Sequence, residues 1–376
     1  MPARSGRSWL DFQVPVSSMS KSLTILQEEA IELLKKLIAL PSFSKEEQQT
    51  ADLIEKYLEG KGVRAKTHLN NIWAQNKFFT EGKPVLLLNS HHDTVKPNKG
   101  YTLDPFLPLV KDEKLFGLGS NDAGASLVAL LAVFLHYYDQ PDLKYNIIYA
   151  ATAEEEISGP NGVECLLPRL GNIDCGIVGE PTQMQMAVAE KGLLVIDALA
   201  TGRAGHAARE EGENAIYLAL QDIAWFQHYQ FPKVSPLLGP VKMTITVIET
   251  ENKAHNVVPA QCRFVVDCRV NELYSFEEIL EILERQVKSQ LKPRSTRLRS
   301  TAIDLKHPLV EAGLHLGRTY YGSPTTSDKA LMPFPTLKLG PGDSARSHTA
   351  DEYIYLQEIR EGIDLSIRLL DQLLLV

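Results

Sequence analysis

Short apolar runs alternate with helical patterns along the first half of the chain, and this alternation limits the fold more than any other feature. The runs cover residues 85–88, 145–151 and 175–178, and a long helical pattern at residues 123–138 separates the first two. Strands that alternate with helices predict a doubly wound, mostly parallel α/β sheet. In such sheets the chemistry collects just beyond the carboxyl ends of the strands. Each of the three runs ends in a polar cluster.

The amino-terminal part of the chain is expected to form two amphipathic helices, at residues 22–40 and 44–59. Ser44 and Glu47 have the spacing of a capping box at the start of the second helix. Residues 1–20 contain early arginines but no continuous apolar segment, which argues against a secretory signal. They are interpreted as a loose tail or a start site set too early, with a transit peptide as the minor alternative.

The pattern changes at residues 192–303. The expected elements are a strand (193–200), a helix (214–229), two strands (241–249 and 261–270), a helix (275–291) and a strand (296–303). This β-α-β-β-α-β order is typical of a self-contained ferredoxin-like α+β unit. Helix-rich sequence resumes at residue 304, so the unit is predicted to be inserted into a first domain formed by residues 21–191 and 304–376.

The charge and the cysteine content exclude several classes of protein. Acidic residues outnumber basic ones and give a net charge of −8, whereas nucleic acids and membrane surfaces attract basic patches. No apolar run approaches the roughly 18–20 residues that span a bilayer. The 4 cysteines form no CxxC pair, and so few cysteines favour a reduced, cytoplasmic location. We therefore expect neither a nucleic-acid nor a membrane partner.

Histidines and carboxylates gather at the predicted strand ends and in glycine-rich loops. They are His91 and Asp93 after the first strand, Asp122 at the start of the long helix, Glu154, Glu155 and Glu156 after the second strand, Glu180 after the third, and His348 near the carboxyl terminus. Each group alone also has an ordinary interpretation, because aspartates cap helices, acidic triplets form solvated turns, and single loop histidines are often inert. Residues i and i+2 of a strand point the same way. Asp93 is therefore expected to orient His91 through its second ring nitrogen rather than to bind the same metal.

Taken together, these side chains point to a metal centre. Two histidines and at least three carboxylates from one predicted sheet form a ligand set that suits zinc or cobalt, and carboxylates can bridge two ions. Two ions about 3.5–4 Å apart can polarise a carbonyl and deprotonate a shared water. This chemistry hydrolyses amides.

The motifs that carry these residues resemble those of the M20 family of zinc-dependent aminoacylases, deacylases and carboxypeptidases. The matching segments are SHHDTV, GLGSNDAGAS, TAEEE, GEPT and GPGDSARSHTADEY. The resemblance covers nearly the whole chain from about residue 22. Within the family, the sequence is most similar to the group of acetylornithine deacetylases and succinyl-diaminopimelate desuccinylases. It implies that residues 192–303 act as a lid and dimerisation domain.

The resemblance implies two zinc ions per chain, for which cobalt could substitute. The implied ligands are His91, Asp122, Glu156, Glu180 and His348. Asp122 would bridge both ions, His91 and Glu180 would complete the first, and Glu156 and His348 the second. Glu155 would be the general base, since adjacent residues at a strand end diverge and a base near two cations stays ionised.

The resemblance also assigns residues outside this cluster. His206 would stabilise the tetrahedral oxyanion, often from a partner subunit, and Asn256 and Arg269 would bind the substrate, Arg269 through its carboxylate. The ordinary alternatives are that His206 caps a loop and that Arg269 pairs with Asp267. We also predict that Arg346 adds positive charge near the acyl pocket and favours a dicarboxylic acyl group.

The sequence thus predicts a cytoplasmic, homodimeric, metal-dependent amidohydrolase that acts on a small N-acyl amino acid. The first expectation is N-acetylornithine deacetylase in arginine biosynthesis. The alternatives are N-succinylornithine desuccinylase, succinyl-diaminopimelate desuccinylase, acetylcitrulline deacetylase and an M20 dipeptidase. A metal-free binding protein on the same scaffold is disfavoured because every implied ligand and the implied base are present.

Overall fold

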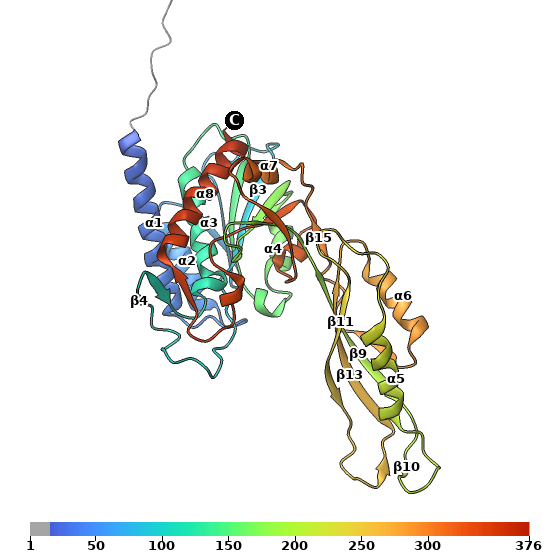
Figure 1. The fold of residues 1–376 in the computed structure, drawn as a ribbon. Helices are drawn as coiled ribbons and strands as arrows, with labels where there is room; N and C mark the ends of the chain where they lie inside the picture. Colours follow the sequence, from blue (N-terminus) through green and yellow to red (C-terminus); the bar gives the residue numbers. More distant parts are fainter. Residues whose placement is uncertain (1–15, 376) are drawn as a thin grey trace, which may run out of the picture.

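The computed structural model describes residues 16–375. The chain forms two lobes, a larger one built around a nine-stranded sheet and a narrower one that extends away from it (Figure 1). Each lobe has its own hydrophobic core. Within the described residues, no helix has the length and apolar character needed to cross a membrane.

The central sheet of the larger lobe is mostly parallel in its middle, as predicted. Its order is β1-β2-β6-β3-β7-β17-β8-β15, and β16 pairs with β8. The strands are β1 (Ala65–His68), β2 (Asn71–Gln75), β3 (Val85–His91), β6 (Asn146–Thr152), β7 (Cys175–Val178), β8 (Met186–Glu190), β15 (Thr301–Ala302), β16 (Tyr320–Ser323) and β17 (Thr336–Lys338). The four strands β6, β3, β7 and β17 run parallel, and antiparallel pairs flank them on both sides.

Helices cover both faces of this sheet. They are α1 (Val16–Ile38), α2 (Gln48–Gly60), α3 (Ala125–Tyr137), α4 (Val163–Leu170), α7 (Pro308–His315) and α8 (Leu356–Leu374). Side chains alternate along a strand, so Leu86 and Leu88 of β3 join the core under α1, α3 and α8, whereas Leu87 packs on the α4 side. This two-sided burial explains why β3 is apolar without interruption until its last three residues. A small sheet of β4 (Leu109–Lys111), β5 (Lys114–Phe116) and β18 (Tyr353–Tyr355) lies beside it.

The narrower lobe has the predicted ferredoxin-like order. Its elements are β9 (Gly192–Thr201), α5 (Ala215–His228), β11 (Lys242–Glu249), β13 (Gln261–Val270), α6 (Phe276–Gln286) and β14 (Gln290–Pro293), with a small pair β10 (Gly205–His206) and β12 (Val257–Val258) at its tip. The four-stranded sheet has the order β11-β13-β9-β14, and every pair is antiparallel.

The last strand of this lobe corrects the sequence prediction. A strand was expected at residues 296–303, but α6 ends at Gln286 and the edge strand is β14, Gln290–Pro293. Leu291 packs against the core of the lobe, and Pro293 is tolerated because an edge strand leaves one row of N–H groups unpaired. Thr301 and Ala302 instead pair with β8 of the central sheet.

Two predictions for the amino-terminal region were also wrong. Helix α1 begins at Val16, so part of the segment interpreted as a tail is helical, and residues 1–15 lie outside the described residues. Ser44 and Glu47 form no capping box, because α2 begins at Gln48, so that Glu47 and not Ser44 is the residue that precedes the helix. Ser44 Oγ donates to Asp93 instead, and Glu47 accepts from the backbone N–H of Lys45 and Glu154.

Candidate metal centre

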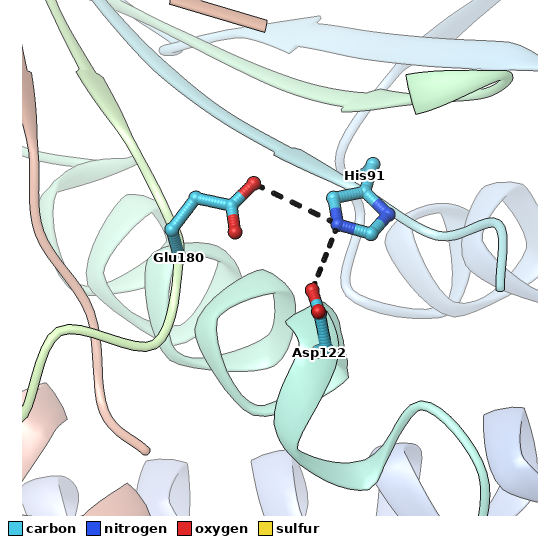
Figure 2. A group of neighbouring side chains, drawn as sticks. All are labelled: His91, Asp122 and Glu180. Atoms are coloured by element: carbon cyan, nitrogen blue, oxygen red, sulfur yellow. Dashed lines mark ion pairs between the residues drawn. The ribbon is translucent and has the colours of Figure 1, made fainter. Parts of the chain in front are cut away.

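The carboxyl ends of three neighbouring parallel strands deliver the polar side chains. His91 is the last residue of β3, Glu180 lies two residues beyond β7, and Glu155 and Glu156 lie just beyond β6. Asp122, from the turn Ser120–Gly124 before α3, faces His91 and Glu180 (Figure 2). Parallel strands end at the same edge of a sheet, and this is why residues so far apart in sequence meet.

The ring of His91 is held so that one nitrogen is free. Nδ1 lies 3.0 Å from the backbone oxygen of Asp93. A carbonyl oxygen only accepts, so Nδ1 donates and Nε2 of the neutral ring presents its lone pair. Nε2 is buried without a hydrogen-bond partner. It faces the carboxylates of Asp122 at 3.4 Å, Glu180 at 3.7 Å and Glu155 at 3.8 Å.

Asp122 lies between two histidines. Its Oδ1 is 3.4 Å from His91 Nε2, and its Oδ2 is 3.6 Å from His348 Nε2. The ordinary capping interpretation does not apply, since α3 begins at Ala125 and no side chain caps it. One carboxylate that offers its two oxygens to two separate groups has the arrangement of a bridging ligand.

The three adjacent glutamates point in different directions. Glu154 has a left-handed backbone (φ 56°), and its carboxylate accepts from Asn161. Glu155 turns towards His91, whereas Glu156 Oε2 lies 3.0 Å from His348 Nε2. The acidic triplet is therefore not a solvated turn, because each of its members has its own partner.

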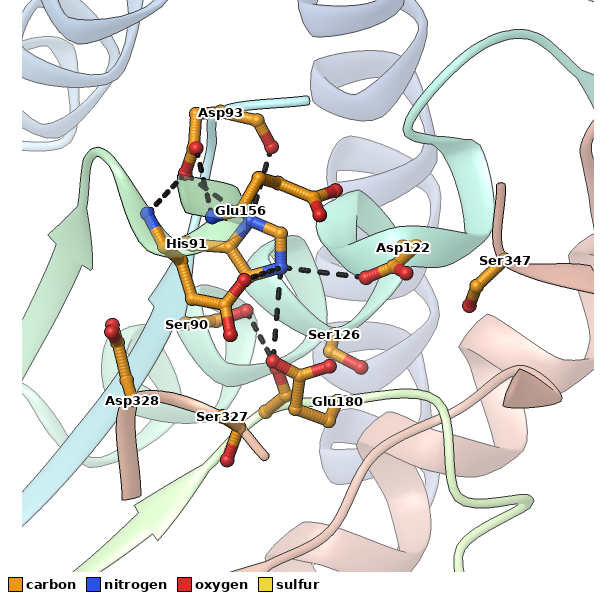
Figure 3. Close-up of polar contacts among 12 residues, drawn as sticks. Ser90, His91, Asp93, Asp122, Ser126, Glu156, Glu180, Ser327, Asp328 and Ser347 are labelled. Carbon is orange, nitrogen blue, oxygen red and sulfur yellow. Dashed lines mark hydrogen bonds and ion pairs between the residues drawn. The ribbon is translucent and has the colours of Figure 1, made fainter. Parts of the chain in front are cut away.

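Asp93 has a role beyond the predicted one. Its Oδ1 lies 3.4 Å from His91 Nδ1, and its oxygens accept the backbone N–H groups of Glu155 at 3.0 Å and Glu156 at 3.2 Å (Figure 3). Ser44 donates a further hydrogen bond of 2.7 Å. One buried carboxylate therefore sets the position of the histidine and of the segment that carries both glutamates.

Sequence reasoning missed Glu352. This buried carboxylate accepts the backbone N–H groups of Gly119, Asn121 and Asp122, at 2.8–3.1 Å. It therefore holds the turn that presents Asp122. Its only sequence signal is its place four residues after His348, in the segment already singled out.

The electrostatics of the cluster favour a cation. Burial alone would lower the pKa of His91, but the neighbouring carboxylates, Glu155 first, raise it well above its ordinary value. Burial raises the pKa of Glu180 to about 8, with repulsion from Asp122 adding to it. The hydrogen bond with Glu156 raises the pKa of His348 to about 9. Surplus negative charge at a buried site is stabilised by metal ions.

The residues fit a pair of metal ions. Two groups of three have ligand atoms within 4.8 Å of one another: His91, Asp122 and Glu180, and Asp122, Glu156 and His348. These are the five residues that the family resemblance implies as ligands, and they fall into the two implied groups, which share Asp122. The unpartnered Nε2 of His91 and a nitrogen and oxygen donor set both suit zinc.

A cavity of about 280 Å³ opens onto both groups. It is lined by ligands of both, by Glu155, by Lys338, and by the hydroxyl-bearing residues Tyr321, Ser323 and Thr325. This volume suits a small molecule.

The structure does not bring the other predicted residues to this cavity within one chain. His206 lies in β10, at the tip of the narrower lobe (Figure 1), where the backbone N–H of Ala207 bonds to the oxygen of Asn256. Arg269 pairs with Asp267 through two hydrogen bonds of 2.8 and 3.0 Å. Both remain predictions as substrate-binding or catalytic residues.

The position of Arg346 argues against its predicted role. Its guanidinium makes two hydrogen bonds to Glu358 of α8, at 2.6 and 2.9 Å, and lies over the rings of Tyr353 and Tyr355. Arg346 is not among the described residues that line the cavity. Its charge is therefore neutralised away from the position of an acyl group.

We compared the sequence with those of known protein families. The profile of peptidase family M20/M25/M40 matches residues 87–372. The chain belongs to this family. It is therefore a metal-dependent hydrolase of amide bonds, and the resemblance seen in the sequence motifs is confirmed.

Two relatives within the M20 family are about a quarter identical to the chain over the aligned residues. Succinyl-diaminopimelate desuccinylase 2 of Ruegeria sp. (strain TM1040) is 25% identical over 69% of this chain and 70% of its own length. A Peptidase M20 domain-containing protein of Schizosaccharomyces pombe is 27% identical over 92% of this chain and 84% of its own length.

Solved M20 structures have the same fold. An M20 metallo-carboxypeptidase of Sulfolobus solfataricus superposes with a TM-score of 0.73 at 15% identity, covering 92% of this chain and 99% of its own. The Bacillus subtilis YXEP protein, described as a dinuclear metal binding peptidase, superposes with a TM-score of 0.70 at 16% identity, covering 92% of this chain and 98% of its own.

Proposed function

We propose that this M20 enzyme hydrolyses the N-acyl amide of an N-acyl amino acid at a two-metal centre. The observation that carries the proposal is the pair of ligand groups that share Asp122, with Glu155 beside them at the wall of one cavity. The dinuclear metal centre named for the YXEP protein supports the same arrangement.

The chain's own residues account for the movement of protons. Metal ions held by the two groups would polarise the acyl carbonyl and acidify water. Glu155, which lines the cavity without belonging to either group, would accept the proton of the attacking water. It would then donate this proton to the leaving nitrogen as the C–N bond breaks, releasing a carboxylic acid and an amine.

Two different observations limit which acyl group and which amine the substrate contains. The resemblance of the sequence motifs favours N-acetyl-L-ornithine, which would make the chain an acetylornithine deacetylase of arginine biosynthesis. The names of several relatives, succinyl-diaminopimelate desuccinylases among them, favour a succinyl group as the second candidate. Both candidates place a small N-acyl amino acid in the same cavity.

A substrate panel tests the proposal. We expect ornithine release from N-acetyl-L-ornithine or N-succinyl-L-ornithine, abolished by a chelator and restored by zinc, because carbonyl polarisation depends on the metal. Mass-spectrometric detection of the free diamino acid measures it, with N-succinyl-diaminopimelate as the third substrate. If protein that holds about two zinc ions per chain hydrolyses a dipeptide and none of these substrates, the proposed substrate class is wrong and the substrate is a peptide.

We also propose that the narrower lobe acts as a lid and forms a homodimer. His206 is exposed at the lobe's tip, and one chain alone leaves it away from the cavity (Figure 1). A partner subunit is the simplest source of a histidine at the oxyanion.

Mixing two inactive variants tests this arrangement. Chains with Glu155→Ala and chains with His206→Ala should each be nearly inactive alone. Subunit exchange in an equimolar mixture should restore up to about a quarter of wild-type activity, because half of the dimers are mixed and one of their two sites is intact. The control is the same mixture without exchange, which should stay inactive. Persistent inactivity after exchange, shown by mixed dimers in native mass spectrometry, would contradict a role of His206 in the partner's site.

A further inference from the structure

One lysine has no part in the chemistry described so far, yet it lines the catalytic cavity. Lys338 is the last residue of β17, and only 5% of it is exposed. It lines the same cavity as Glu155 and the members of both ligand groups. Among the described residues of that lining, it is the only lysine or arginine.

The partners of Lys338 are one carboxylate and two neutral hydroxyls. Its Nζ lies 3.1 Å from Glu190 Oε1, and it donates to the hydroxyls of Thr325 at 3.2 Å and Ser323 at 3.5 Å. A carboxylate that enters the cavity could replace a neutral hydroxyl as the acceptor. Glu190 is fully buried and lies outside the cavity lining, and it also accepts from Ser327. Lys338 therefore stands between a buried glutamate behind it and the open cavity in front.

A second lysine shares the same glutamate. Lys329 is 1% exposed, and its Nζ donates to the backbone oxygens of Ala187 and Val188 at 3.3 and 3.2 Å. Glu190 attracts both lysines, and the two lysines repel each other. Glu180 of the first ligand group also attracts Lys338. With Glu180 bound to a metal ion, Glu190 would be the one carboxylate left to balance the two buried ammonium groups. Burying such a charge is costly unless an anion pairs with it.

We propose that Lys338 is the specificity-determining residue that binds a carboxylate of the substrate remote from the scissile amide. The hydroxyls of Tyr321, Ser323 and Thr325 in the same lining supply further donors of the kind that carboxylates accept. The metal groups would hold the amide, and Lys338 would hold the other end of the molecule. The inference deepens the proposed function and rests on it. Lys338 thereby takes the role in substrate recognition that the sequence analysis predicted for Arg346, whose charge Glu358 already neutralises.

A substrate comparison tests this role and identifies which carboxylate is bound. The arms are N-succinyl-L-ornithine, N-butyryl-L-ornithine, which lacks the acyl carboxylate, and N-succinyl-L-ornithine amide, which lacks the α-carboxylate. In Lys338→Met, the preference in kcat/KM for the fully charged substrate should fall about 10- to 100-fold, as expected for the loss of a charge-assisted hydrogen bond. A fall relative to the butyryl compound assigns the acyl carboxylate, and a fall relative to the amide assigns the α-carboxylate.

Two further variants separate recognition from structure. Lys329→Met removes a buried lysine beside the same Glu190 but outside the cavity lining, so its substrate preference should match the wild type. Lys338→Arg keeps the charge and should recover much of the preference. Equal preferences in Lys338→Met and wild type would overturn the proposal, as would equal losses in Lys329→Met.

A binding measurement decides the inference even if no acyl amino acid is hydrolysed. Titration calorimetry of the zinc-loaded protein should show succinate binding more tightly than butyrate, with the difference abolished in Lys338→Met. If no acyl amino acid is hydrolysed but succinate still binds more tightly than butyrate, the proposed substrates are wrong and the carboxylate site stands. Equal affinity for the two acids in the wild type would exclude the acyl carboxylate. Equal affinity for L-ornithine and L-ornithine amide as well would overturn the site itself.

Discussion

Glu155→Gln should lower kcat by about 10³- to 10⁴-fold while the protein keeps its metal, because the general base is lost without removing a ligand. Glutamine keeps the size of the side chain but cannot accept and return a proton. Glu155 belongs to neither ligand group, although its Oε2 lies 3.8 Å from His91 Nε2. Steady-state kinetics and elemental analysis of the same preparation measure the two quantities together.

The adjacent residue is the matched control for Glu155. Glu156→Gln changes the same chemical group one position along, but Glu156 belongs to the second ligand group with His348. It should therefore lose metal as well as activity, and excess zinc should restore part of both. Metal loss in Glu155→Gln of the same size would show that Glu155 is a ligand and that the base is another group.

Asp122→Asn should remove more metal than any other single ligand variant. Asp122 is the one residue common to both groups, and its two oxygens face His91 and His348. An amide nitrogen cannot bind a cation, so one of the two bridging bonds is lost and the two positive charges lose a shared counter-charge. We expect fewer than about one ion per chain and a fall in kcat of about 10³-fold or more at equal zinc.

Glu352→Gln is the comparison that separates ligation from positioning. Glu352 binds the backbone of the Asp122 turn and not the metal itself. Its loss should weaken metal binding by about 10- to 100-fold, as for residues that orient ligands, and excess zinc should overcome the defect. If Asp122→Asn recovers as readily with excess zinc, the two variants act alike and the bridging role is wrong.

A polar cluster suited to metal could be predicted from the sequence because of the topology. His91, Glu156 and Glu180 lie at or just beyond the ends of parallel strands, and such ends converge at one edge of the sheet. The resemblance implied which of these residues are ligands and how the glutamate triplet divides, and the divergence of adjacent side chains explains that division. The ferredoxin-like order of residues 192–303 could also be predicted, because an apolar run marks β9 and alternating apolar residues mark β13.

The errors have a common physical cause, which is pairing across long sequence distances. Ser44 and Glu47 have local capping spacing, but tertiary partners take both side chains. Lys338 pairs with Glu190, and Glu352 binds the turn that carries Asp122. No local sequence pattern reveals either contact. The short edge strand β14 contains lysine and proline, so nothing in its composition indicates a strand.

The order in which the ligands occur along the chain bears on when metal can be captured during synthesis. His91, Asp122, Glu156 and Glu180 all precede the inserted lobe, whereas His348 and Glu352 follow it. A ribosome-bound chain therefore exposes an acidic, half-built site while the whole lobe is still being translated. High-affinity capture of a pair of ions must wait until the last segment docks, since metal affinity depends on a preformed site. We therefore expect the full pair of ions only in chains whose translation is complete.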